Sequence, residues 1–361
     1  MEERPANLND QSVPAWSRPD GWALGSFRGR SGRAVTGLVL DDVVFDVNVL
    51  MPAAAASGAL TVRSLVEDWD ANFERLHRHA GEIRETGAED QLWERARTPL
   101  AELQVLALVQ PPGQVFQSGA NYRTHVIDLL VAQRVGAEDG MDEGELRRRS
   151  VTAVDERIAQ DTPYVFLGLP SAVCGPYDDV VLPDLGSEHD WELELAAVIG
   201  RPARRVGRER ALEYVAGYTI CNDITTRDLV YRPDLPAIGT DWLRAKNAPT
   251  FLPTGPFLVP AAFVPDPHDV RITLRLNEDV MQDESAADMI FGVDRLIEHV
   301  SSVTQMNPGD MLLTGSPAGN GSKWHRFLTP GDVIDSEISG LGSQRNRCVA
   351  EALGDPRSPS Q

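Results

Sequence analysis

Short runs in which apolar and polar positions alternate dominate the chain from residue 164 onward. Such runs are typical of β-strands with one buried face, because successive side chains of a strand point to opposite sides. Proline and glycine separate the runs and indicate turns. This pattern predicts a mostly-β barrel or sandwich within an α+β fold. The expected strands are Tyr164–Leu167, Val180–Leu182, Trp191–Ile199, Val215–Cys221, Phe257–Val259, Ile272–Leu276, Met311–Leu313 and Val333–Ile338.

The first 110 residues have a pattern of their own. Strands are expected at Ala23–Phe27, Thr36–Leu40, Val43–Val47 and Leu103–Val109, whereas residues 62–98 carry apolar side chains at helical spacing. We therefore expect a small N-terminal α+β domain at 1–110 that begins with a loose polar arm at 1–20. A second domain is expected at 111–353, followed by a polar tail at 354–361.

A charged, amphipathic segment follows the strand expected at Val115–Asn121. From His125 to Asp161 it predicts one or two surface helices with a break between Gly136 and Gly144. This segment is either a solvated helical excursion or a mobile lid, since long excursions from compact domains are often functional. Its part at 129–162 is expected to be a lid or a dimer contact. Further helices are expected at Arg208–Glu213, Thr225–Leu229 and Val293–Val303.

Composition narrows the class of protein. Apolar residues make up 42% of the 361 positions, enough to bury a core, and the formal net charge is −20. A surface this acidic repels phosphate, so nucleic acid is not expected as a partner. The most apolar window, Val47 to Val62, is too short for the roughly 20 residues that span a membrane. With three cysteines and no basic, apolar leader, the chain is expected to be a soluble cytoplasmic protein.

The most informative stretch is the predicted strand that holds Glu192 and Glu194. Alternate residues of a strand share a face, so both carboxylates point the same way while Trp191, Leu193 and Leu195 point into apolar packing. Two neighbouring carboxylates repel each other unless a cation lies between them, and burial without a partner is costly. The alternative is a pair of exposed glutamates on an edge strand.

A second acidic position lies where another apolar strand ends, in Cys221-Asn222-Asp223. Thr225 and Asp228 fit the spacing of a helix cap, which leaves Asp223 free at the end of the strand. Taken alone, Asp223 reads as a turn residue. Together with Glu192 and Glu194 it supplies three oxygen ligands for a hard cation, and open positions for water and substrate suit Mg²⁺ or Mn²⁺ better than a closed Ca²⁺ site.

These motifs, in this order, resemble the fumarylacetoacetate hydrolase family over about residues 115–340. The resemblance is carried by Gly119-Ala120-Asn121-Tyr122, Asp190-Trp191-Glu192-Leu193-Glu194-Leu195, Thr226-Arg227-Asp228 and Thr314-Gly315-Ser316-Pro317. It implies a β-rich roll or barrel, a divalent metal held by Glu192, Glu194 and Asp223, and a homodimer. It also implies action on a small 2-oxo or 1,3-dioxo acid.

The resemblance implies further roles. His125 would be a general base with Asp128 as its partner, where many relatives have a glutamate that is one methylene longer. Lys246 would stabilise developing negative charge. Tyr122, Arg227, Gln282 and Ser316 would contact the substrate, although a salt bridge to a ligand carboxylate is an alternative for Arg227.

Three functions follow as hypotheses. The first is a hydrolase that cleaves a C–C bond in an acylpyruvate-like or β-diketo acid. The second is a decarboxylase, lyase or hydratase acting on a related 2-oxo acid such as oxaloacetate. Decarboxylation and lyase chemistry need less of the His125–Asp128 pair. The third is a catalytically silent metal-binding dimeric scaffold.

Overall fold

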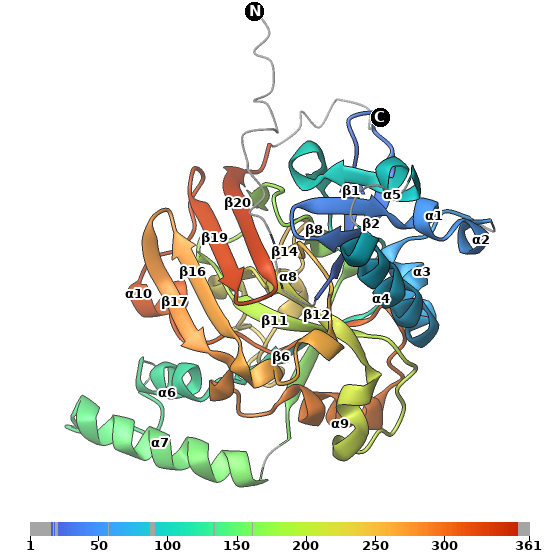
Figure 1. The fold of residues 1–361 in the computed structure, drawn as a ribbon. Coiled ribbons are helices and arrows are strands. Elements are labelled where there is room, and N and C mark those ends of the chain that lie inside the picture. The colour runs from blue at the N-terminus through green and yellow to red at the C-terminus, as the bar shows by residue number, and fades with distance from the viewer. Residues whose placement is uncertain are drawn as a thin grey trace, which may run out of the picture.

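The computed structural model describes residues 16, 18, 21–56, 58–86, 91–132, 134–160 and 162–352. Most of the expected arm at 1–20 and the whole tail at 354–361 lie outside these residues. Two five-stranded sheets flank a central six-stranded sheet (Figure 1). The mostly-β, α+β prediction is confirmed.

The central sheet carries the functional positions. Its strand order is β15-β12-β11-β18-β6-β7, and β11 and β12 pair antiparallel with Leu193 opposite Asn222. Every residue of β11 and β12 is buried, because Leu193 and Leu195 pack into one apolar cluster while Ala196 and Val198 pack into another. The strands are β6 (Val115–Gly119), β7 (Tyr164–Gly168), β11 (Leu193–Ile199), β12 (Val215–Asn222), β15 (Val259–Pro260) and β18 (Met311–Leu313).

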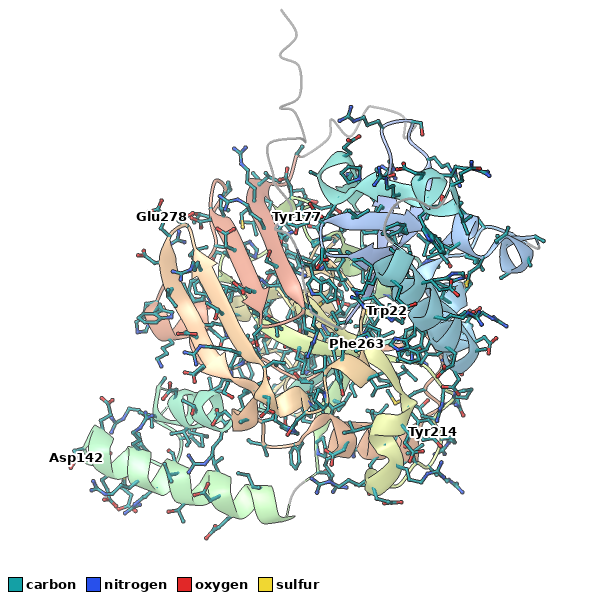
Figure 2. All side chains as sticks on the ribbon, in the orientation of Figure 1. Trp22, Asp142, Tyr177, Tyr214, Phe263 and Glu278 are labelled. Carbon is teal, nitrogen blue, oxygen red and sulfur yellow. The ribbon has the colours of Figure 1, made fainter. Side chains whose placement is uncertain are left out.

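The first flanking sheet is N-terminal and has the order β4-β3-β2-β1-β5. Its core joins that of the central sheet: Leu24 and Leu258 exchange backbone hydrogen bonds of 3.0 and 2.8 Å. At the same junction the rings of Trp22 and Phe263 lie 5.8 Å apart (Figure 2). The strands are β1 (Ala23–Arg28), β2 (Ala34–Leu40), β3 (Val43–Asp46), β4 (Arg97–Pro99) and β5 (Gln104–Val105). The helices are α1 (Val47–Leu50), α2 (Pro52–Ala55), α3 (Val62–Glu67), α4 (Trp69–Thr86), α5 (Gln91–Ala96) and the 3₁₀ turn η2 (Leu100–Glu102).

The second flanking sheet has the order β17-β16-β19-β20-β9. It consists of β9 (Val180–Leu182), β16 (Arg271–Leu276), β17 (Asp279–Ser285), β19 (Val333–Ile338) and β20 (Gly342–Ala350). Two short pairs complete the strands: β10 (His189–Asp190) with β13 (Thr225–Thr226), and β8 (Val173–Cys174) with β14 (Leu252–Pro253). The sequence pattern missed β17 and β20, whose polar residues and glycine do not resemble a strand.

The C-terminal part of the chain also contains α-helices and 3₁₀ turns. They are α6 (Arg123–Ala132), α7 (Glu143–Gln160), α8 (Trp242–Lys246), α9 (Val293–Val303) and α10 (Gly321–Trp324). The 3₁₀ turns are η3 (Pro170–Ala172), η4 (Arg208–Tyr214), η5 (Arg227–Leu229), η6 (Ala261–Phe263), η7 (Pro267–Asp269) and η8 (Ala286–Asp288). Helices α6 and α7 form a hairpin at one edge of the molecule, far from the N-terminal sheet (Figure 1). The predicted helical break between Gly136 and Gly144 falls between them.

Several expected boundaries are wrong. The strand expected from Trp191 begins at Leu193, and the one expected at Leu103–Val109 covers only Gln104–Val105. The helix expected at Thr225–Leu229 is absent: Thr225 and Thr226 are a strand, and η5 follows. The proposed helix cap is therefore wrong as well, since Asp228 accepts hydrogen bonds from the backbone of Ser187 and Glu188 instead.

Candidate metal centre

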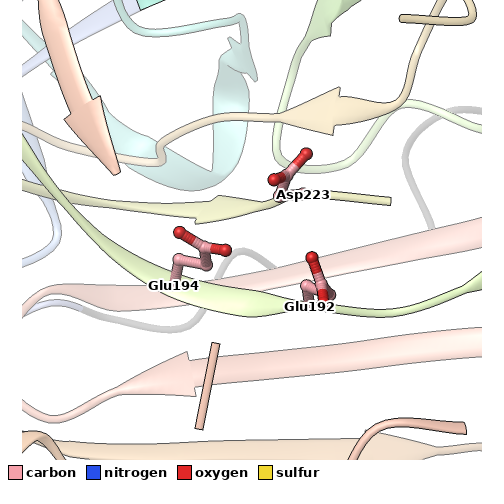
Figure 3. A group of neighbouring side chains, drawn as sticks. All are labelled: Glu192, Glu194 and Asp223. Carbon is pink, nitrogen blue, oxygen red and sulfur yellow. The ribbon is translucent and has the colours of Figure 1, made fainter. Parts of the chain in front are cut away.

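Three buried carboxylates converge where β11 begins and β12 ends. Glu192 directly precedes β11, Glu194 is its second residue, and Asp223 directly follows β12. The antiparallel register brings these positions to one end of the sheet, and the Asp223 amide donates to the Glu192 carbonyl at 2.8 Å. One oxygen of each carboxylate lies within 4.8 Å of the others (Figure 3). The structure thus brings together the three residues predicted to bind a metal.

Lys246 is the nearest cation to this triad. Its side chain is 3% exposed, and its Nζ lies 2.5 Å from both Glu192 Oε2 and Asp223 Oδ2. Burial alone would lower the pKa of Lys246, but Asp223, Glu192 and Glu194 raise it above its usual value. The lysine is therefore an ammonium ion at neutral pH, next to the carboxylates as the family resemblance implied.

Arg227 holds two carboxylates from the side of η5. Its Nε donates to Asp190 Oδ2 at 2.8 Å and its Nη2 to Glu192 Oε1 at 2.7 Å. Burial would raise the pKa of Glu192, but Arg227 and Lys246 outweigh this and hold the pKa well below its usual range. The salt-bridge alternative for Arg227 is therefore observed, and a contact with substrate stays a prediction.

In the remaining two triad members burial and repulsion outweigh the effect of the nearby cations on the pKa. Burial raises the pKa of Glu194, and repulsion from Asp223 and Glu192 raises it further, although Glu194 Oε2 accepts the Gly315 amide at 2.7 Å. Burial also raises the pKa of Asp223 to about 6. In both residues burial is the main cause, and repulsion from neighbouring carboxylates adds to it.

A charge count tests whether a divalent metal fits. Four carboxylates face two cations in this cluster, which leaves a net charge of −2. One divalent cation would neutralise it. The cluster consists of Asp190, Glu192, Glu194, Asp223, Arg227 and Lys246. The donor set contains only carboxylate oxygens, which Mg²⁺ and Mn²⁺ favour. The residues present therefore fit a hard divalent ion.

Two further side chains orient the ligands, and sequence reasoning missed both. Gln117 of β6 is fully buried, and its Nε2 donates to Asp223 Oδ1 at 2.7 Å. The Thr225 hydroxyl lies 3.2 Å from Glu192 Oε2 and donates to the Asp223 carbonyl at 3.0 Å. Such contacts fix the orientation of metal ligands. The alternation of β6 could have indicated that Gln117 faces inward, but not which carboxylate it meets.

Two of the residues predicted to contact the substrate, Gln282 and Ser316, lie in contact with each other. Gln282 Nε2 lies 3.1 Å from Ser316 Oγ, and its Oε1 accepts the Leu193 amide at 3.2 Å. Tyr122 is also buried. Burial is the main cause that raises the pKa of its phenol, and repulsion from Glu194 adds to it. The contact of these three residues with substrate stays a prediction.

His125 and Asp128 both lie on α6. Burial lowers the pKa of His125, although Glu192 opposes the shift, so the imidazole is neutral at pH 7. The carboxylate of Asp128 is engaged elsewhere: Arg147 Nη1 donates to Oδ1 at 2.9 Å and Lys323 Nζ to Oδ2 at 2.8 Å. The proposed partnership between His125 and Asp128 stays a prediction.

This site and this fold define a class of metal-dependent enzymes. A family model for the fumarylacetoacetate hydrolase C-terminal domain matches residues 114–349. The chain belongs to the fumarylacetoacetate hydrolase family.

Individual relatives agree with this assignment. The mitochondrial oxaloacetate tautomerase FAHD2A of Bos taurus is 35% identical over 253 residues, which are 70% of this chain and 71% of that protein. The solved maleylpyruvate hydrolase of Sphingobium sp. SYK-6, in complex with manganese(II) and pyruvate, is 26% identical with a TM-score of 0.66, over 91% of this chain and 100% of that one. A fumarylacetoacetate hydrolase of Exiguobacterium antarcticum is 28% identical with a TM-score of 0.67, over the same shares.

Two expectations concern membrane insertion and cellular location. No helix in the described ranges is long and apolar enough to cross a membrane. Several curated relatives are named as mitochondrial, so the expected cytoplasmic location stays a prediction.

Proposed function

We propose that this protein is a divalent-metal-dependent hydrolase that cleaves a C–C bond in an acylpyruvate-like acid, with Mg²⁺ or Mn²⁺ as the ion. The observation that carries the proposal is the buried triad of Glu192, Glu194 and Asp223, in which one oxygen of each carboxylate lies within 4.8 Å of the others. With Asp190, Arg227 and Lys246 the triad forms a cluster of four carboxylates and two cations. When bound, the ion would supply a Lewis acid for the 2-oxo carboxylate of the substrate. The solved relative that holds manganese and pyruvate supports this assignment.

The chain's own residues supply the other functions. Neutral His125 would accept a proton from the water that attacks the C4 carbonyl, since the low pKa of its imidazole leaves it unprotonated at pH 7. The C3–C4 bond then breaks, the acyl part leaves as a carboxylic acid, and the proton passes to C3 of pyruvate. The Lys246 ammonium would stabilise the negative charge that develops on the pyruvate part.

The experiment is a metal-dependent turnover assay. Purified protein, stripped of metal and reloaded with Mn²⁺ or Mg²⁺, is given a panel of acylpyruvates, and pyruvate release is followed. Glu192→Ala is expected to abolish turnover, whereas Glu337→Ala, an exposed glutamate on β19, is expected to keep it. Folding of both variants is checked by circular dichroism. Turnover that is equal with and without metal would contradict the proposal.

A second candidate is keto–enol tautomerisation or decarboxylation of oxaloacetate. The observation that favours it is the engagement of Asp128 by Arg147 and Lys323, because these reactions need no activated water. The curated relatives named as oxaloacetate tautomerases point the same way. Loss of the enol absorbance without release of pyruvate or CO₂ would identify the tautomerase, and CO₂ release would identify the decarboxylase.

Two further proposals concern the oligomeric state and the helical insertion. We expect a homodimer located in the cytoplasm, and sedimentation of the purified protein tests whether it is a dimer. A helical insertion at 129–162 that acts as a lid or dimer contact is tested by its deletion, which should change KM, kcat or the oligomeric state.

A further inference from the structure

An aromatic stack lies beside the Lys246 ammonium. The rings of Phe166, from β7, and Trp242, from α8, have centroids 4.5 Å apart and planes inclined by 13°. Lys246 Nζ lies 5.6 Å from the ring centroid of Phe166 and 6.0 Å from that of Trp242. Both distances are within the roughly 6 Å over which the negative face of a ring attracts a cation. The stack therefore adjoins the side chain to which the proposed function gives charge stabilisation.

The sequence places Trp242 and Lys246 on one face of the same short helix. They are the first and last residues of α8, four positions apart, and side chains at this spacing are neighbours on a helix surface. Asp241 caps the helix, since its carboxylate accepts the Arg244 amide at 3.2 Å. The position of the indole ring is thereby tied to that of the lysine side chain.

A neighbouring strand fixes the indole from the other direction. Trp242 Nε1 donates to the Tyr164 hydroxyl at 2.6 Å. Tyr164 and Phe166 are alternate residues of β7, so they share a face of that strand, and their ring centroids lie 5.9 Å apart. One hydrogen bond and one stacked ring from β7 thus hold the indole in a single orientation.

The stack suits an ammonium ion that is buried among carboxylates. The side chain of Lys246 is 3% exposed, whereas Phe166 and Trp242 are partly buried and Tyr164 reaches the surface. The ammonium has therefore left most of its water, and attraction to a ring face is stronger where water is excluded. Because the rings are neutral, they add nothing to the net charge of −2 of the carboxylate cluster.

We propose that Phe166 and Trp242 are positioning residues for Lys246, whose ammonium they hold where negative charge develops on the pyruvate part of the substrate. This inference rests on the proposed function and adds two residues that act through Lys246. The competing explanation is a structural role, in which the two rings only pack α8 against β7.

The first experiment measures kcat and KM of Mn²⁺-loaded Trp242→Leu on an acylpyruvate. Leucine is apolar but has no ring face. Because Lys246 acts on charge that forms in the transition state, kcat should fall about 3- to 30-fold while KM changes less than about twofold. Trp242→Phe keeps a ring face, so its kcat should stay within about threefold of that of the natural sequence. A change in KM alone, or equal losses in the two variants, would overturn the inference.

A double-mutant cycle separates positioning from packing. In the Lys246→Met background the ring has no ammonium to hold, so Trp242→Leu should change kcat less than about twofold. The same fall in both backgrounds would assign the ring a structural role and overturn the inference. Leu243→Ala is the matched control, because Leu243 lies on α8 and is 66% exposed, and it should leave both constants unchanged. Circular dichroism checks folding, and Phe166→Leu carries the same comparison if Trp242→Leu does not fold.

Binding of oxalate makes the test independent of turnover. Oxalate is a planar dianion, as is the enolate of pyruvate, so the Lys246 ammonium should favour it for the same reason. If the protein hydrolyses no acylpyruvate, the proposed function is wrong, and calorimetry of oxalate with Mn²⁺-loaded protein replaces kcat. An affinity that falls about 3- to 30-fold in Trp242→Leu, but less than twofold in the Lys246→Met background, would support positioning. Equal losses in both backgrounds, no loss, or no binding of oxalate would overturn it.

Discussion

Replacing Lys246 by methionine removes the cation on which the triad depends in the absence of metal. The ammonium lies 2.5 Å from Glu192 and from Asp223, and the side chain is 3% exposed, so bulk water contributes little to neutralising these carboxylates. Methionine has a similar length and no charge. Because the raised pKa of Lys246 keeps it charged across the neutral range, the change removes a full positive charge at pH 7.

The size of the effect follows from the burial of these groups. Breaking a buried ion pair by removing one partner costs about 3–5 kcal/mol, because the remaining carboxylates stay buried. At roughly 2–4 °C per kcal/mol for a domain of this kind, the metal-free variant should unfold about 6–20 °C below the natural protein. Two positive charges from Mn²⁺ would compensate part of this loss, so the deficit should shrink when Mn²⁺ is present.

The assay is thermal unfolding with and without Mn²⁺, by differential scanning fluorimetry. Lys323→Met is the control for stability, since that lysine forms an exposed pair that contributes at most about 1 kcal/mol. A metal-free loss for Lys246→Met that is no larger than the control, or a deficit that Mn²⁺ leaves unchanged, would refute the assignment of Lys246 as the neutralising cation.

Three other predictions concern the same site. Gln117→Leu should weaken Mn²⁺ binding about 10- to 100-fold in calorimetry, because it frees the carboxylate of Asp223. Burial raises the pKa of Asp223 to about 6 and also raises the pKa of Glu194, and both carboxylates must be deprotonated to bind a metal, so Mn²⁺ affinity should fall steadily as pH is lowered through 6. His125→Gln should lower hydrolysis of an acylpyruvate roughly 10²- to 10⁴-fold, while Mn²⁺ affinity changes less than about twofold. An unchanged affinity for Gln117→Leu, a flat pH profile or an active His125→Gln would each contradict its prediction.

The triad was predictable because its signals are local. The two-residue period of a strand places Glu192 and Glu194 on one face, and the apolar run to Ile199 indicates burial. Asp223 could be assigned because it follows an apolar strand directly. Helix α9 at Val293–Val303 was predicted to the residue, since its apolar side chains recur at helical spacing throughout.

The contacts that were not predictable join distant parts of the chain. The partner of Gln117 is 106 residues away, and the contact between Asp128 and Lys323 spans 195 residues. Thr225 fits a helix cap by local spacing, but pairing of Thr225 with Asp190 across β10 and β13 prevails over that preference. Such pairings depend on the register of the whole sheet, which no single segment encodes.

The central claim is that one divalent cation is bound by Glu192, Glu194 and Asp223. The most direct measurement is a crystal structure of the protein with Mn²⁺, with anomalous differences recorded to locate the ion. We expect one strong peak at about 2.0–2.6 Å from an oxygen of each of the three carboxylates, the range of hard cations in proteins. A map with no peak there, or with manganese only at other carboxylates, would contradict the account.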